Sequence, residues 1–121
     1  MSVFRKGLVY RLMPTRHWDI ALASGFLPYN ADDERDGFFH LSGPDQVMGT
    51  AARFYADCDE LVCAGFAEKT LADDLKWEGA SDHGVFPHYY GFVRTEWVQH
   101  KLAVNKQPSG QFDVVDNAEG A

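Results

Sequence analysis

His40 and Ser42 are the first residues whose types and positions suggest chemistry. His40 lies in the apolar run Phe38–Leu41, directly before a predicted helix start. Its imidazole can bind a ligand hydroxyl or act as a general acid–base near neutral pH. Ser42 and the first turn of the helix add hydroxyl and backbone N–H donors, which favour an anion. The alternative is a buried structural histidine that bonds a backbone carbonyl.

The stretch Phe86–Gly91 has the densest unusual composition, with the sequence FPHYYG. Its proline restrains the backbone and its glycine frees it, while His88 and two tyrosines lie between them. This composition predicts a rigid binding turn in which His88 and Tyr90 offer contact and stacking surfaces. The alternative is an aromatic-rich connection that closes the core.

Two charged residues in or beside predicted strands are further candidates. Arg11 lies in a strand that is predicted to be buried, so its partner is either an anionic ligand or an internal carboxylate. Glu78 follows Trp77 at a strand end, where a carboxylate with a raised pKa would be a candidate catalytic acid. The alternative for Glu78 is an exposed strand end.

A metal site is not predicted. His40, His83 and His88 are the only histidines that suggest one, but the spacing of the last two fits no helical pair and no partner carboxylate is specified. The chain also has no CxxC pair, glycine-rich phosphate loop or nucleophile elbow.

The elements that must position these residues follow from hydrophobic spacing. Strands are expected at 8–13, 38–41, 61–67 and 75–78, with weaker ones at 92–97, 102–105 and 112–115. Helices are expected from Thr15 to Ser24, ended by Gly25, and from about Pro44 to Asp57, with a helical turn at 70–74. Residues 30–37 and 79–84 are expected to be loops, the former charged and exposed. The order predicts an α+β fold, a mixed twisted sheet with two main helices on one side.

Composition sets the class of molecule. The 121 residues fit a single domain with its core at about 8–106 and a partly ordered acidic segment at 107–121. The net charge of −7 argues against general nucleic-acid binding, although a small anionic ligand fits a local basic site. Two cysteines give no disulfide framework, and no signal peptide or membrane-spanning run is found. A cytoplasmic protein without membrane contact is therefore expected.

Several motifs fall in a fixed order along the chain. They are YRLM, GF, DGFFHLS, the DQV helix, KWE and FPHYYG. In this order and at these separations they resemble the bacterial family known as domain of unknown function 952, from about Leu8 to Val98. No activity is attached to that family by name.

That family is in turn similar to the ADP-ribosyltransferase fold, especially to the NAD-using RNA 2′-phosphotransferases. The resemblance places Tyr10 and Arg11 at the first-strand motif, and His40 and Ser42 at the second. It implies that Arg11 holds a phosphate or ribose of NAD, His40 a ribose hydroxyl, and Ser42 the anion. Tyr10 and His88 would border the cofactor, and Tyr90 would stack on nicotinamide or adenine.

The chain departs from the protein-modifying transferases at their late glutamate. The segment FPHYYG, which aligns there, has no acid; Glu78 lies one strand too early and Glu96 too late. The phosphotransferases also lack that glutamate, so the departure argues against protein ADP-ribosylation more than against NAD binding.

Three functions follow as hypotheses. The first is an ADP-ribosyltransferase-like domain that binds NAD or a related nucleotide and transfers ADP-ribose to a phosphorylated small molecule. Arg11 and His40 would be its catalytic residues, without a metal. The second is a nucleotide- or ligand-sensing module without turnover, and the third is a metal-dependent hydrolase.

Overall fold

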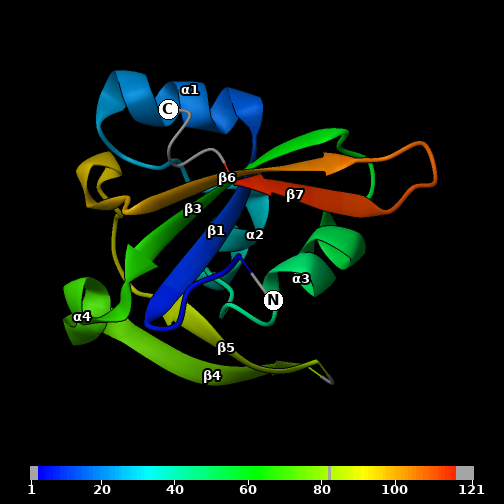
Figure 1. Ribbon diagram of the computed structural model, residues 1–121. Coiled ribbons are helices and arrows are strands. Elements are labelled where there is room, and N and C mark those ends of the chain that lie inside the picture. Colours follow the sequence, from blue (N-terminus) through cyan, green and yellow to red (C-terminus); the bar gives the residue numbers. More distant parts are fainter. Residues whose placement is uncertain (1–2, 82, 117–121) are drawn as a thin grey trace.

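The computed structural model describes residues 3–81 and 83–116 and shows an α+β chain (Figure 1). In chain order the elements are β1 (Leu8–Pro14), α1 (Thr15–Ser24), α2 (Ala31–Asp36), β2 (Phe39–His40), α3 (Val47–Phe54), β3 (Glu60–Ala67), α4 (Glu68–Leu71), the 3-10 turn η1 (Ala72–Asp74), β4 (Leu75–Ser81), β5 (Gly84–Tyr89), the 3-10 turn η2 (Thr95–Trp97), β6 (His100–Lys106) and β7 (Phe112–Asp116). No helix in the described part is long and apolar enough to span a membrane.

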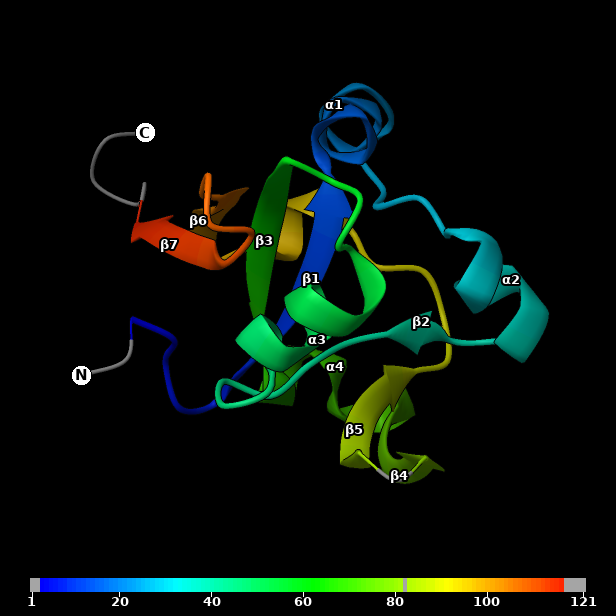
Figure 2. The same ribbon diagram turned by 90° about the vertical axis from the view of Figure 1, so that its right-hand side faces the viewer.

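The strands form two sheets. One has the order β1-β3-β6-β7 and the other β2-β5-β4. Every strand pairing in the described residues is antiparallel, so the prediction of one mixed sheet was wrong. Figure 2 shows β4 and β5 below β1 and β3, with α1 at the opposite end of the molecule. The α+β class is confirmed.

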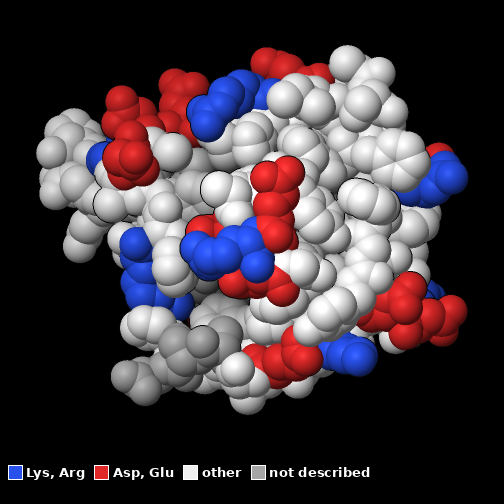
Figure 3. Space-filling view, turned by 180° about the vertical axis from the view of Figure 1, so that it is seen from behind, with Lys and Arg blue, Asp and Glu red and all other residues white. Residues whose placement is uncertain are grey.

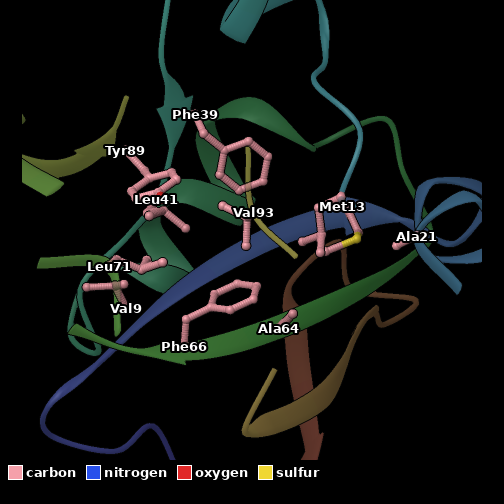
Figure 4. Close-up of a cluster of buried hydrophobic side chains, with 11 residues drawn as sticks. Val9, Met13, Ala21, Phe39, Leu41, Ala64, Phe66, Leu71, Tyr89 and Val93 are labelled. Carbon is pink, nitrogen blue, oxygen red and sulfur yellow. The ribbon is translucent and has the colours of Figure 1, made fainter. Parts of the chain in front are cut away.

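The core lies on both faces of β1 and β3. Successive side chains of a strand point to opposite faces, so Val9 and Met13 of β1 join one apolar cluster and Leu8, Tyr10 and Leu12 join the other. Figure 4 shows the first cluster, in which side chains of β1 and β3 face those of β2 and β5. The almost continuous burial of β3 confirms the prediction of a strand covered on both faces.

Pro87 ends the pairing between β2 and β5. The ladder matches Phe39 with Tyr89 and His40 with His88, and the Leu41 N–H then donates to the carbonyl of Pro87. Proline has no N–H to return this bond, so the chain leaves β5 at that point. Ser42 instead exchanges two 2.8 Å backbone hydrogen bonds with Tyr10 of β1, which joins the two sheets.

The segment 30–37 is a helix, not the exposed loop that its charge predicted. The Asn30 side chain accepts from the Asp33 backbone N–H and the Asp33 side chain accepts from the Asn30 N–H, each at 2.8 Å. This reciprocal cap starts α2, and Gly37 ends it with a left-handed φ of 84°.

Other predictions of local structure need correction. α1 has the predicted bounds and Gly25 ends it, but Pro14 rather than Thr15 is its N-cap. α3 begins at Val47, after a turn, so Ser42 does not lie at a helix N-terminus. The stretch Phe86–Tyr89 is part of strand β5 rather than a turn. The expected strand at 92–97 is replaced by one bridge, from Phe26 to Arg94, and by η2.

The C-terminal segment, residues 107–121, contains strand β7. β7 confirms the strand predicted at 112–115 and lies at the edge of the larger sheet, paired with β6. The predicted partial order of residues 117–121 lies outside the described residues.

Gly65 makes room for the ring of Tyr10. A Cβ at Gly65 would lie 2.7 Å from Cε2 of Tyr10. The Tyr10 hydroxyl accepts a hydrogen bond from the Arg5 N–H and shares another with His100 Nδ1, and these bonds hold the ring. We expect Gly65→Ala to lower the free energy of unfolding by about 1–3 kcal/mol, because the ring cannot yield without losing these bonds. Urea titration measures the change.

Gly79→Ala is the matched control for this prediction. Gly79 lies in β4, where an added Cβ meets nothing within 4 Å. Its free energy of unfolding should change by less than about 0.5 kcal/mol. Equal stability of the two variants would show that the Tyr10 ring moves aside at little cost.

Candidate functional site

A pocket of about 330 Å³ lies where the two sheets meet. It is lined from β1, α2, β2, α3 and β5, which are distant in sequence. Five of the seven predicted site residues border it: Tyr10, Arg11, His40, Ser42 and His88. Tyr90 and Glu78 do not border it. The roles of these residues stay predictions, but their contacts decide which roles are open to them.

Arg11 forms an internal ion pair. Its two terminal nitrogens lie 3.0 and 2.6 Å from the two carboxylate oxygens of Asp33, and both side chains are buried. Nη1 also donates to the His40 carbonyl at 3.0 Å, while the guanidinium stacks 4.0 Å from the centre of the Phe39 ring. This is the internal-carboxylate alternative for Arg11. Its guanidinium is occupied and is not placed to hold a ligand phosphate.

Asp33 is the centre of this network. Besides Arg11, its carboxylate accepts from the backbone N–H of Asn30 at 2.8 Å and of His40 at 3.0 Å, and contacts His40 Nδ1 at 2.7 Å. Burial alone would raise the pKa of Asp33. The hydrogen bonds from His40 and Arg11 and the charge of Arg11 outweigh burial and hold the pKa well below its usual range.

His40 is held by carboxylates at both ring nitrogens. Nδ1 faces Asp33 at 2.7 Å and Nε2 faces Asp36 at 2.9 Å, and a third of the side chain is exposed. A neutral imidazole can donate to one of these carboxylates, and an imidazolium can donate to both. Neither nitrogen is open to a ligand in this arrangement, so His40 forms the wall of the pocket.

Ser42 is also satisfied internally. Its hydroxyl lies 2.9 Å from the hydroxyl of Thr50, which donates to the Gln46 carbonyl at 3.1 Å. Ser42 must therefore donate its own proton to Thr50. This geometry and the later start of α3 do not support the expectation that Ser42 binds an anion.

Tyr10 borders the pocket, but its ring packs in the apolar cluster on the other face of β1, with Leu8 and Leu12. The side chain is 1% exposed, and its hydroxyl lies 2.9 Å from His100 Nδ1. Neighbouring residues of β1 point to opposite faces, so Arg11 faces the pocket network and the Tyr10 ring does not. The expected cofactor contact of Tyr10 is not supported by this position.

His88 lies opposite His40 across the β2–β5 ladder, with ring centres 5.6 Å apart. The Phe38 ring stacks on His88 at 3.9 Å between centres. His88 Nδ1 lies 2.8 Å from Oε1 of Glu78, which also accepts from the Tyr90 hydroxyl at 2.7 Å. The neighbouring strand β4 thus supplies a carboxylate that fixes the orientation of the His88 ring.

Glu78 is an ionised acceptor, so a catalytic acid with a raised pKa, one of the two alternatives for this residue, is not supported. The hydrogen bonds from Tyr90 and His88 lower its pKa. The Tyr90 hydroxyl is bound to this carboxylate, and Lys76 Nζ lies 5.1 Å from the centre of the Tyr90 ring. Tyr90 therefore supports the Glu78 carboxylate, and its expected stacking on a ligand base is not supported.

Sequence reasoning missed Asp33 and Asp36, which bind Arg11 and His40. It also missed Arg53 and Phe54, which line the pocket. The capping sequence that begins at Asn30 was the available signal for Asp33, since a capping box pairs the N-cap residue with the third helical residue. Phe54 is 61% exposed at the end of α3, so burial gives no signal for it.

Charges near the pocket are mostly paired. Arg35 bonds Asp32 at 2.8 Å and Asp36 at 2.9 Å. Figure 3 shows acidic and basic side chains packed together at the centre of the face on which α2 lies. Among residues 3–81 and 83–116, no group of three or more His, Cys, Asp or Glu side chains is placed so that it could hold a metal ion.

Comparisons with known proteins agree with the motif order. A family model described as "Protein of unknown function (DUF952)" matches residues 12–101. The X-ray crystal structure of protein CC0527 from Caulobacter crescentus is similar, with a TM-score of 0.80 and 31% identity over 88% of this chain and 93% of that chain. Its solution NMR structure gives a TM-score of 0.74 and 31% identity over 95% and 97%.

No curated protein matches the chain. The descriptions of the matched structures state no activity or ligand, and the matches do not extend to an ADP-ribosyltransferase. They do cover nearly the whole of both chains, in agreement with the family model. The chain belongs to the family described as protein of unknown function DUF952.

Proposed function

We propose that the pocket binds NAD or a related nucleotide. The observation that carries this proposal is a cation beside an exposed aromatic ring at the pocket. Within the described residues Arg53 forms no ion pair, and its Cζ lies 5.8 Å from the centre of the Phe54 ring. An unpaired guanidinium suits a phosphate and an exposed ring suits a base or nicotinamide, so together they suit a nucleotide.

The size of the pocket limits how such a ligand binds. Small-molecule sites commonly have volumes of about 300–1000 Å³, and this one lies at the lower end at about 330 Å³. The pocket would therefore enclose one half of a dinucleotide, with the other half on the surface. Arg53 and Phe54, both exposed, would contact the ligand at the rim.

The proposed reaction is transfer of ADP-ribose from NAD to a phosphorylated small molecule. An oxygen of the acceptor phosphate attacks the ribose carbon that carries nicotinamide, and nicotinamide leaves with the electron pair of the broken C–N bond. A phosphate is already an anion, so this attack needs no carboxylate base. The proposal draws support from the resemblance of the motifs around Arg11 and His40 to those of the ADP-ribosyltransferases. These two residues order the pocket wall and do not themselves contact the phosphate.

A ligand-sensing module without turnover is the second candidate. The observation that favours it is the internal bonding of Arg11 and His40, the two residues expected to be catalytic. Release of nicotinamide from NAD, measured with and without phosphorylated acceptors, separates the two functions.

NAD should raise the melting temperature of the protein. A ligand that binds only the native state at ten times its Kd stabilises it by about 1.4 kcal/mol, or about 3–6 °C for a chain of this size. Arg53→Gln should lose most of this shift because it removes the proposed phosphate contact. Differential scanning fluorimetry over a range of NAD concentrations measures the effect.

Arg16→Gln provides the matched control, since Arg16 is an exposed arginine that does not border the pocket. This variant should keep the full shift. If millimolar NAD leaves the melting temperature of the wild type unchanged, or if Arg53→Gln responds as the wild type does, the proposed binding site is wrong.

A further inference from the structure

We infer that His88 is the general base of the pocket. It takes the proton from a hydroxyl, of water or of an alcohol, that receives ADP-ribose. The inference rests on the proposed binding of NAD and extends it to a second class of acceptor. It depends on which imidazole nitrogen of the site is open and on what holds the other one.

His88 has one ring nitrogen engaged and one open. Its Nδ1 is bound to Glu78, and Nε2 has no hydrogen-bond partner among the described residues. In the same residues no buried side-chain nitrogen or oxygen lacks a partner. Nε2 is therefore not sealed in the interior. His88 is one of the residues that line the pocket, and the inference assigns this nitrogen to the pocket side of the ring.

Glu78 fixes the chemical form of that nitrogen. A carboxylate at Nδ1 holds the proton there, so the neutral ring presents an electron pair at Nε2. The Tyr90 hydroxyl donates to the same carboxylate oxygen and keeps it in place, and the pKa of Glu78 is lowered. When Nε2 takes up a proton, the ionised carboxylate stabilises the resulting imidazolium.

The other groups around His88 do not compete for this role. His40, whose ring centre lies 5.6 Å from that of His88, has both nitrogens at the carboxylates of Asp33 and Asp36. Lys76 is the register partner of His88 on β4, and its ammonium lies near the Tyr90 ring. Phe38 covers one face of the His88 ring. The two histidines thus have different roles: His40 lines the pocket, and His88 is the general base.

The step is a substitution at the nicotinamide-bearing ribose carbon. The hydroxyl oxygen forms a bond to that carbon while its proton passes to His88 Nε2. The C–N bond breaks and nicotinamide leaves with the electron pair. With water the products are ADP-ribose, nicotinamide and one proton, and with an alcohol the O-alkyl ADP-ribose replaces ADP-ribose.

The test uses NAD with water and with added methanol as acceptors. Wild-type protein is expected to release nicotinamide in both cases and to form methyl ADP-ribose with methanol. His88→Asn should lower kcat at saturating NAD by about 100-fold or more, as loss of a general base does, while the NAD-induced melting shift stays. Glu78→Gln should lower kcat about tenfold with KM unchanged, since it acts through His88.

The control is His17→Asn, because His17 lies on α1 and does not border the pocket. It should retain wild-type kcat. In the ligand-free protein, ¹⁵N NMR of the imidazole should show the proton of neutral His88 on Nδ1.

The outcomes separate this inference from the proposed function. A melting shift with NAD but no nicotinamide release from the wild type with either acceptor would overturn the role of His88 and leave nucleotide binding intact. Release that His88→Asn leaves unchanged would do the same, as would an NMR proton on Nε2. No melting shift with NAD would overturn both.

Discussion

Asp33→Asn is expected to lower the free energy of unfolding by about 3–5 kcal/mol, the usual cost of removing one partner of a buried ion pair. Asp33 is fully buried, and its carboxylate neutralises Arg11, which is 2% exposed. An asparagine has nearly the same shape but carries no charge, so the Arg11 guanidinium would stay buried without a counter-ion. Urea unfolding followed by circular dichroism gives the change.

Two further variants show whether charge is the cause. Asp32→Asn changes the adjacent carboxylate, whose side chain is 50% exposed, and should cost less than about 0.5 kcal/mol. Arg11→Met combined with Asp33→Asn removes both charges, and its loss should not exceed that of Asp33→Asn alone. A small effect of Asp33→Asn, or a larger loss in the double variant than in Asp33→Asn, would show that the pair contributes little.

The wild type is also expected to lose stability in acid through Asp33. The pKa of Asp33 is lower in the folded than in the unfolded protein, so folding favours the ionised form. This stabilisation is present in full above the unfolded pKa of about 4 and is lost as the pH falls toward the folded pKa. While folded Asp33 remains ionised, the loss below pH 4 is about 1.4 kcal/mol for each pH unit.

Other carboxylates add to the acid dependence, so the measurement is a difference. The free energy of unfolding is measured from pH 6 to pH 2 for the wild type and for Asp33→Asn. The gap between the two curves should be constant above pH 5 and should narrow below pH 4. A gap that stays constant down to pH 2 would mean that the pKa of Asp33 is not lowered by folding.

The main strands could be predicted because their hydrophobic pattern reports burial directly. β1 and β3 have nearly continuous apolar residues and lie between two apolar clusters. α2 could not be found in this way, because its six residues include no apolar face. It is stabilised by its Asn30–Asp33 cap and by Gly37, which are local signals that a search for hydrophobic spacing does not count.

β5 was misread because proline and glycine are typical of turns. Pro87 is tolerated there since its missing N–H falls where the ladder with β2 ends. If the chain from Leu75 to Tyr89 had been interpreted as a hairpin, Glu78 and His88 would have been expected on neighbouring strands. Their side-chain bond depends on that register.

It was easier to predict which residues lie together than what each of them does. Arg11, His40 and His88 were predicted from the motifs to lie together, and all three line one pocket. The partner of Arg11 lies 22 residues away in a helix that was not predicted. A single sequence does not say which of its many carboxylates is the partner, so the choice between an internal pair and a ligand stayed open until the fold was known.

The Asp33 network has a consequence for the thermodynamics of any ligand that enters the pocket. One carboxylate ties β1, α2 and β2 together and fixes the rotamers of Arg11 and His40. The conformational entropy of this wall is therefore lost when the chain folds, and little remains to be lost on binding. A ligand meets a surface that is already ordered, so affinity depends mainly on the contacts made by the exposed residues at its rim.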